Sequence, residues 1–500
     1  MSLARIFLFV KATETFSLHV QPRRRPARLA SARRGSSHAG DWADPGCAPS
    51  DPPFPSPWET IVVKDRRILV KRDDLFRLPE TGLYGNKARK LWSLSRVKAL
   101  KFPRLVVSHG GAQSNSMLSI AAVVHAKNRE LLEKRGGGAL EAAAPVTVTA
   151  EVEASSRASS VDGDFARQLD LMMAGRTPSP FEGPESEAES EAEYYEEEEE
   201  ETGRGRGGGE RESAQTSLAA PKKFVYFTKT VPRWLRQNPS GNYARALALG
   251  AEIRQLSPAA YSDLFASCGG VVSDAPEALR LAKDALWVPQ GGACAGAEEG
   301  VKLLADEIFE AWSSQGGGQG AAAVVKVREL EKAGGGARQR LAVVLPGGTG
   351  ATALFLARHL QPRGITVVVV PCVGDLRGAY LWRQMSELDA LTGGAGDKMP
   401  LLLLDDRGGA RPFGEPKAEL LEVWRMLERE CNLTVDLLYG ARAWEVLLSR
   451  LDSLPRQLRG RPDRGDFVQL CYLHCGGLEG TSSQLNRYKH AGLFERHQAI

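Results

Sequence analysis

The chain lacks the marks of three common protein classes. Its seven cysteines are an odd number scattered through 500 residues, which does not resemble a disulfide framework and suits a reducing compartment. No run reaches the roughly 18 apolar residues that a membrane-spanning helix needs. The net charge is only +4, so composition gives no general reason to expect nucleic-acid binding. We therefore expect neither a membrane nor a nucleic acid as a partner.

Acidic residues are also scarce at the start of the chain. Glu14 is the only acid among the first forty residues, which hold many arginines and several serines. Such a start is typical of an organellar transit peptide, mitochondrial or plastid. The alternative is a disordered basic tail with no targeting role, which would leave the protein in the cytoplasm. Residues 1–57 are therefore expected to be a transit peptide and a linker.

The length and the apolar fraction of 42% predict two domains together with non-globular segments. The segment at about residues 129–221 contains a glutamate-rich run, Glu182–Glu201, followed by an Arg-Gly stretch. It cannot bury enough apolar surface to offset its chain entropy, so we expect a disordered insertion. An RNA-binding role for the Arg-Gly stretch is the weaker alternative. A second Gly-rich insertion is expected at about residues 314–338.

Outside these insertions, short apolar runs alternate with helical patterns. This order predicts a parallel sheet with helices on both faces. A pair of strands is expected around the turn at residues 64–66. The other expected strands are 105–107, 224–227, 341–345 and 366–370, and the expected helices are 117–127, 241–249, 297–312 and 353–360.

One short stretch, Gly85–Leu91, carries two lysines. Apolar residues at Leu91, Leu94, Val97 and Leu100 follow at about one-turn spacing and predict a helix. Lys87 would then lie at the helix start, where the positive end of the helix dipole favours its neutral, nucleophilic amine. The alternative is a solvated basic helix start.

Two glycine-rich turns each follow an apolar strand and precede a helix. The first is Ser108–Asn115 and the second is Pro346–Thr352. This arrangement points backbone N–H groups at an anion, and glycines allow its close approach. The second turn lacks the Gly-Lys-Ser/Thr of a P-loop and the Gly-x-Gly-x-x-Gly of dinucleotide folds. An ordinary turn remains the alternative for it.

A nucleophilic lysine, a Ser-Asn helix start and a Gly/Thr phosphate loop together suit pyridoxal phosphate. The lysine would bind the aldehyde, the loop would hold the phosphate, and Ser114-Asn115 could bind the carboxylate of an amino-acid substrate. With these motifs the chain resembles the D-cysteine desulfhydrase and 1-aminocyclopropane-1-carboxylate deaminase family, closest to the plant-type D-cysteine desulfhydrase branch. The resemblance covers about residues 58–495 apart from the insertions. It rests on Lys71–Asp74, Gly85–Leu91, Gly110–Asn115, Gly347–Thr352, Asp436–Gly440 and His474–Gly477.

This resemblance implies an α/β, two-domain fold of type II, similar to the tryptophan synthase β subunit, with parallel-rich sheets flanked by helices. It implies a large domain of residues 58–91 plus 274–495, a small domain of residues 92–273, and a homodimer. It also implies α,β-elimination on a small amino acid. Carried over by motif, the catalytic residues are Lys87 (the Schiff-base lysine), Ser114 and Tyr439, and the cofactor ligands are Lys87, Lys90, Asn115, Gly347, Gly348, Thr349, Gly350 and Thr352.

Two positions depart from the family pattern. Phe413 stands where the deaminase has a second active-site tyrosine, which makes opening of a cyclopropane ring a weaker alternative to desulfhydration of D-cysteine. Gly440 stands where a Glu or Thr usually contacts the pyridine nitrogen. A non-catalytic cofactor-binding protein is therefore a further alternative.

The spacing of Cys471, His474 and Cys475 could suggest a metal site. The alternation of apolar residues before it and the glycine pair after it favour a strand leading into a loop instead. A closed structural zinc site needs four ligands, so no metal is expected.

Overall fold

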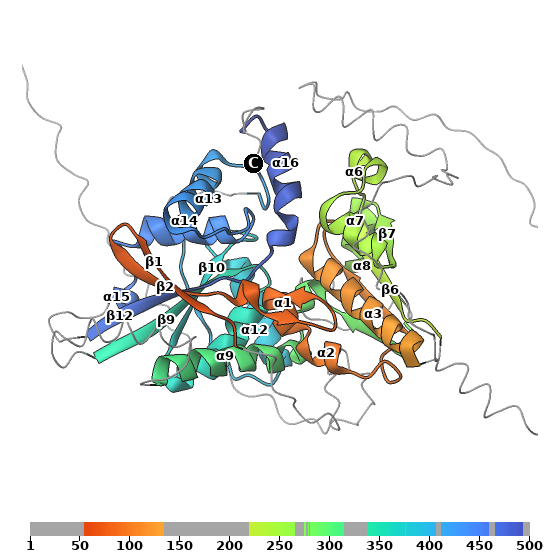
Figure 1. Ribbon diagram of the computed structural model, residues 1–500, viewed down its shortest axis with the longest axis horizontal. Helices are drawn as coiled ribbons and strands as arrows, with labels where there is room; N and C mark the ends of the chain where they lie inside the picture. Colours follow the sequence, from red (N-terminus) through yellow and green to blue (C-terminus); the bar gives the residue numbers. More distant parts are fainter. Residues whose placement is uncertain are drawn as a thin grey trace, which may run out of the picture. The chain divides into compact units, whose positions relative to one another are not determined.

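The computed structural model shows an α/β protein with two parallel-rich sheets and helices packed against them (Figure 1). It describes residues 55–134, 220–265, 275–276, 279, 281–314, 338–375, 377–406, 412–459 and 466–493. All of these belong to one unit of the chain, Ala39–Ile500. The expected transit peptide and both expected insertions lie outside the described residues, apart from a few residues at their edges.

The larger sheet has six strands in the order β1-β2-β12-β9-β10-β11. Only β1 and β2 pair antiparallel, and every other pairing is parallel. Because parallel neighbours require crossover connections, helices cover both faces. The strands are β1 (Trp58–Val63), β2 (Arg66–Lys71), β9 (Arg338–Gly347), β10 (Thr366–Pro371), β11 (Leu401–Leu402) and β12 (Asp466–Leu473).

The main helices of this sheet pack on its two faces. They are α9 (Glu298–Ser313), α11 (Ala351–Leu360), α12 (Ala379–Leu391), α13 (Ala418–Cys431), α14 (Gly440–Arg450) and α16 (Thr481–His490). Leu341, Val343 and Leu345 of β9 pack in one core with α9, α11 and α12. Ala342 and Val344 pack in a second core with α13, α14 and α16. Alternate residues of an extended strand point to opposite faces, so one apolar run supplies both cores.

The smaller sheet has four parallel strands in the order β7-β6-β5-β8. Its strands are β5 (Leu105–His109), β6 (Lys223–Lys229), β7 (Ala251–Leu256) and β8 (Ala285–Val288), and its helices are α3 (Asn115–Lys134), α7 (Gly241–Ala248) and α8 (Pro258–Phe265). The strand β8 thus joins the smaller sheet, although it follows residue 274. The division of the chain into domains at that residue stays a prediction.

Short elements complete the described chain. They are η1 (Asp73–Leu75), β3 (Arg77–Leu78), β4 (Leu83–Tyr84), α1 (Gly85–Lys90), α2 (Trp92–Arg96), α6 (Arg233–Gln237), η3 (Gln290–Gly292), η4 (Ala295–Ala297), η5 (Gln361–Arg363), α15 (Arg456–Arg459) and η7 (Leu478–Gly480). Among the residues that the structure describes, no helix is long and apolar enough to cross a bilayer.

The expected strands and helices are confirmed except after Lys90. The spacing from Leu91 to Leu100 predicts one continuous helix, but α1 ends at Lys90, α2 ends at Arg96, and Leu100 is 50% exposed. The break lies where α9 comes closest: a Cβ atom on Gly300 would be 2.7 Å from Trp92 Cβ. Tertiary packing therefore overrides the helical period here.

The expected acidic insertion begins later than the sequence predicts, because α3 continues to Lys134. Near the end of α3, the side-chain amide of Asn128 pairs with the backbone of Lys222: Nδ2 donates to the carbonyl at 2.9 Å, and the amide N–H donates to Oδ1 at 2.7 Å. The two described segments on either side of residues 135–219 are therefore tied to each other.

Candidate active site

The lysine helix α1 begins against the loop that follows β12. The backbone N–H of Asn86 donates to the carbonyl of Cys475 at 3.0 Å. Gly85 has φ +66°, and a Cβ atom there would lie 2.6 Å from the same carbonyl oxygen. Only glycine tolerates both conditions. The turn that places Lys87 therefore depends on Gly85.

Burial shapes the charge of both lysines of α1. Lys87 is half-buried, and burial lowers the pKa of its amine below the ordinary 10.5. Lys90 is 3% exposed, and its pKa is lowered further by burial and by the neighbouring charge of Lys87. The sequence predicts a more neutral Lys87 amine because of the helix dipole. In the structure, the pKa is lowered mainly because burial removes water from the charged amine.

A buried ionic cluster lies behind α1 and holds it in place. Arg89 pairs with Asp73 at 2.8 Å and with Glu307 of α9 at 2.7 Å. Lys71 at the end of β2 pairs with Glu307 at 2.8 Å. The Arg89 guanidinium lies 3.5 Å from the ring centre of Phe76. These charges are paired away from solvent, so they connect α1 to both the sheet and α9.

The Gly/Thr loop lies between β9 and α11. Gly350 has φ +79° and caps α11 without any side-chain hydrogen bond, so the first N–H groups of the helix point into the loop. The hydroxyl Oγ1 of Thr352 is buried and has no hydrogen-bond partner among the described residues. A buried hydroxyl without a partner is costly. An anion held at this helix start would satisfy it.

The loop and Lys90 meet at Gly291. The Nζ of Lys90 donates to the carbonyl of Gly291 at 3.1 Å. A Cβ atom on Gly291, whose φ is +72°, would lie 3.0 Å from Thr349 Cγ2. The structure therefore brings together Lys90 and the loop residue Thr349, which are far apart in sequence.

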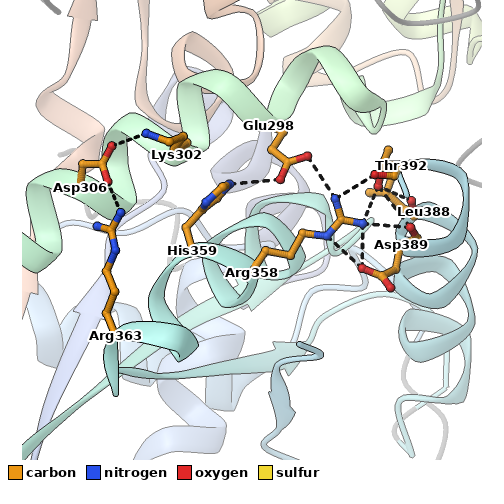
Figure 2. Close-up of polar contacts among 9 residues, drawn as sticks. All are labelled: Glu298, Lys302, Asp306, Arg358, His359, Arg363, Leu388, Asp389 and Thr392. Atoms are coloured by element: carbon orange, nitrogen blue, oxygen red, sulfur yellow. Dashed lines mark hydrogen bonds and ion pairs between the residues drawn. The ribbon is translucent and has the colours of Figure 1, made fainter. Parts of the chain in front are cut away.

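Ion pairs fix the helix that carries the loop. Figure 2 shows Arg358 of α11 between two neighbouring helices: it pairs with Asp389 of α12 at 2.7 Å and with Glu298 of α9 at 3.1 Å. His359 lies 3.1 Å from the other oxygen of Glu298. These pairs hold the last turn of α11, the end opposite the loop, against α9 and α12.

Ser114 and Asn115 lie at the start of α3. The Ser114 hydroxyl accepts hydrogen bonds from the N–H groups of Ser116 and Met117 at 3.2 and 3.4 Å, so it caps the helix. The same hydroxyl also hydrogen-bonds the phenol of Tyr226. Asn115 Oδ1 accepts from Asn242 Nδ2 at 2.5 Å. A Cβ atom on Gly477 would lie 3.1 Å from Asn115 Nδ2, which places Asn115 beside the loop that also contacts α1.

Tyr439 lies at the start of α14. Asp436 caps this helix, accepting from the N–H of Tyr439 at 2.7 Å and of Gly440 at 2.9 Å. Burial and the Asp436 carboxylate raise the pKa of the Tyr439 phenol, which therefore stays protonated. The ring of Phe413 lies 5.2 Å from that of Tyr439. Phe413 and Leu438 help to line a pocket at the end of β10, beside Tyr439 rather than Lys87.

Gly440, the first residue of α14, is closely enclosed by two residues that precede the helix. A Cβ atom there would lie 2.7 Å from Val435 Cβ and 3.1 Å from Asp436 Oδ2. The local packing thus selects glycine, so this position offers no side chain to the site.

The sequence predicts a strand leading into a loop at Cys471–Cys475. This is confirmed, because β12 ends at Leu473. The ring of His474 is used structurally: Nε2 lies 2.7 Å from the Thr434 carbonyl, and Nδ1 accepts from the N–H of Gly476 at 3.1 Å. Within the described residues no group of three or more His, Cys, Asp or Glu side chains could hold a metal ion.

Sequence reasoning missed one acidic residue of this site. Glu479 in η7 is half-buried; burial raises the pKa of its carboxyl, and the hydroxyl of Tyr84, the residue that precedes Gly85, opposes this effect. A single glutamate in the run Gly477–Gly480 gives no periodic or spacing signal. Only the fold brings it to Tyr84, directly before the lysine helix.

No protein-family model and no curated protein matches the chain. Among solved structures, it is similar to a homologue of 1-aminocyclopropane-1-carboxylate deaminase, with 16% identity, 87% of this chain and 94% of that chain covered, and a TM-score of 0.48. It is also similar to a diaminopropionate ammonia lyase of Escherichia coli, with 11% identity, 88% of this chain and 87% of that chain covered, and a TM-score of 0.39. A third similar structure is a hydrogen sulfide-producing enzyme of Fusobacterium nucleatum, with 10% identity, 84% of this chain and 94% of that chain covered, and a TM-score of 0.36. These values are too low to assign a function.

Proposed function

We propose that this protein binds pyridoxal phosphate and catalyses α,β-elimination on a small amino acid. One observation carries the proposal. The helix that bears Lys87 is tied through Lys90 and Gly291 to Thr349 of a Gly/Thr loop. The proposal assigns the Lys87 amine, whose pKa is lowered by burial, and the helix start of α11 to one site, because pyridoxal phosphate needs both an amine and an anion-binding site.

The residues present fit this cofactor. The unpartnered Thr352 hydroxyl and the N–H groups at the start of α11 would hold the phosphate, with the Lys90 amine, which donates to the carbonyl of Gly291, nearby. Asn115 would donate from Nδ2 to the ring oxygen, since its Oδ1 already accepts from Asn242. When bound, pyridoxal phosphate supplies an aldehyde for Lys87 and a ring that withdraws electrons from the substrate.

The chain's own side chains would move the protons. Burial increases the neutral fraction of the Lys87 amine, so Lys87 is the proposed base for the α-proton of the substrate. The Ser114 hydroxyl, whose oxygen already accepts two backbone N–H groups, would donate to the substrate carboxylate. The phenol of Tyr439 stays protonated and would donate to the leaving group.

The proposed substrate is D-cysteine. Elimination of hydrogen sulfide, followed by addition of water and loss of ammonia, gives pyruvate. The resemblance to the plant-type D-cysteine desulfhydrase branch supports this choice. The ring of Phe413 beside Tyr439 also supports it, because the deaminase has a tyrosine at the position of Phe413. Deamination of aminocyclopropane carboxylate or another small amino acid is the runner-up.

A second candidate is a non-catalytic protein that binds the cofactor. The enclosure of Gly440 by Val435 and Asp436 favours it, since no side chain at that position can contact a pyridine nitrogen. A ring without that contact would withdraw electrons less strongly.

The test is an absorbance spectrum of the purified protein with pyridoxal phosphate, before and after D-cysteine is added, with sulfide assayed in the same tube. A cofactor band that changes and releases sulfide is the expected result, and L-cysteine is the control for stereochemistry. A band without sulfide would move the assignment to another amino acid or to the non-catalytic binder. No band at all would overturn the proposal.

A further inference from the structure

The start of α7 is held by a side chain from another element. Ser240, which precedes this helix, makes no capping hydrogen bond with its own side chain. Gln113, in the turn before α3, caps the helix instead. Its Oε1 atom accepts from the N–H groups of Asn242 at 2.9 Å and Tyr243 at 3.3 Å. Its Nε2 atom donates to the carbonyl of Ser240 at 3.1 Å. Backbone groups thus set both ends of the Gln113 amide.

A backbone carbonyl also sets the direction of the Asn242 amide, which is completely buried. Its Nδ2 atom donates to the carbonyl of Gln113 at 3.1 Å and to Asn115 Oδ1 at 2.5 Å. A carbonyl oxygen can only accept, so the atom that faces it must be the nitrogen. The amide keeps this direction although its Oδ1 atom is buried and has no partner among the described residues. Turning it round would bring two acceptors face to face and break both hydrogen bonds.

The direction of the Asn242 amide decides that of Asn115. Because Asn242 presents a donor, the Asn115 atom opposite it must be the acceptor Oδ1. The Nδ2 atom of Asn115 lies on the other side, where a Cβ atom on Gly477 would be 3.1 Å away. The same turn contacts the lysine helix, since a Cβ atom on Gly476 would lie 3.4 Å from Gly85 Cα. The Asn115 donors therefore face the turn that adjoins the start of α1.

We propose that Asn242 is a positioning residue that fixes the Asn115 amide with its Nδ2 donors toward the candidate active site. The inference rests on the proposed function where it names the ring oxygen of pyridoxal phosphate as the acceptor for these donors. An Asn115 amide free to turn would also present Oδ1 to that oxygen, and two acceptors repel each other. The hydrogen bond between the two amides itself requires no cofactor.

The dissociation constant of pyridoxal phosphate, from equilibrium titration, measures the effect. Asn242→Ala removes the donor, and we expect the constant to rise roughly three- to tenfold, the value of one hydrogen bond. Asn242→Asp keeps the size but offers only acceptors, so Asn115 would turn its nitrogen toward the carboxylate and the rise should be larger. If Asn242 only filled space, Asn242→Asp would be the milder change. Asn238→Asp, at an exposed asparagine before α7, is the control and should change nothing.

An Asn115→Ala background separates positioning from damage to α7. If Asn242 acts through Asn115, its substitution there should leave the dissociation constant where Asn115→Ala alone puts it. Gln113→Ala removes the cap that holds Asn242 and is the second variant in case no Asn242 variant folds; its effect should also disappear in this background. Folded variants that bind pyridoxal phosphate as tightly as the parent protein, or losses that add fully to that of Asn115→Ala, would overturn the proposal.

Failure of this inference and failure of the proposed function give different results. In the cofactor-free protein, the urea midpoint should fall less in the double variant Asn115→Ala, Asn242→Ala than the two single losses summed, because both remove the same hydrogen bond. That result in a protein that never gains a cofactor band would keep the amide pair and reject pyridoxal phosphate. A cofactor band and sulfide release with fully additive losses of affinity would do the opposite.

Discussion

The ring of Tyr439 lies against the backbone of Gly348: a Cβ atom on Gly348 would come within 3.0 Å of Tyr439 Cε1. Gly348 belongs to the loop before α11, and Tyr439 directly precedes α14. These helices pack on opposite faces of the larger sheet. Both meet at the carboxyl end of the strands, where ligands of open α/β sheets bind.

The first prediction concerns the lysine itself. Lys87→Ala should abolish the absorbance of bound pyridoxal phosphate and lower turnover at least about 10³-fold, because no other amine replaces it at that position. Its thermal unfolding should change little, since a half-buried lysine contributes little apolar packing. Lys98→Ala, at an exposed lysine, is the control. An unchanged cofactor band in Lys87→Ala would refute the assignment.

The second prediction is that Thr352→Val leaves the cofactor-free protein at least as stable as before but weakens the binding of pyridoxal phosphate. Thr352→Val removes a buried hydroxyl that lacks a partner among the described residues, so the cofactor-free protein should be equally or slightly more stable. The dissociation constant of pyridoxal phosphate should rise about tenfold or more, the value of one hydrogen bond to a charged group. Equilibrium titration and thermal unfolding measure the two effects. The control is Thr366→Val at the start of β10, which should change neither stability nor cofactor affinity. If Thr352→Val bound pyridoxal phosphate as tightly as the parent protein, Thr352 would not be a phosphate ligand.

The third prediction addresses Gly440. Gly440→Ala places a methyl group 2.7 Å from Val435 Cβ, so we expect a loss of about 1–3 kcal/mol in the free energy of unfolding. Urea denaturation measures this loss. Ser449→Ala, near the end of the same helix, should cost less than about 0.5 kcal/mol. A Gly440→Ala variant as stable as the parent protein would contradict the close packing of Gly440 against Val435.

The fourth prediction concerns acid stability. Burial raises the pKa of Glu307, but the Arg89 and Lys71 cations outweigh it, so the net pKa lies below the ordinary 4.5. A carboxyl whose pKa is lower in the folded state stabilises the fold above about pH 4.5, and this contribution is lost as the pH falls through the folded-state pKa. Glu307→Gln should cost about 3–5 kcal/mol at pH 7, because it leaves buried cations without their partner.

The difference in urea midpoint between the parent protein and Glu307→Gln should therefore shrink as the pH is lowered from 7 to 3. A difference that stays constant over this range would contradict the ionic role of Glu307. Glu310→Gln, one turn further along α9, is the matched control.

Much of this fold can be read from the sequence because its strands are short apolar runs bounded by glycines, such as Leu341–Leu345 before Gly347. The helix break at Leu91 could not be predicted, since the leucine spacing continues through it and only the close approach of Gly300 explains it. Lys87 and the Gly/Thr loop carry local signals. The contact between Lys90, Gly291 and Thr349 is a product of chain topology.

The amide pairing of Asn128 with Lys222 has a consequence for how this protein can vary. A connection whose two ends are already held together adds only about 0.6 kcal/mol of closure free energy for each doubling of its length. Selection on stability therefore constrains the number of residues between these ends very little. The same position offers protein engineers a place to insert a reporter domain without altering the smaller sheet.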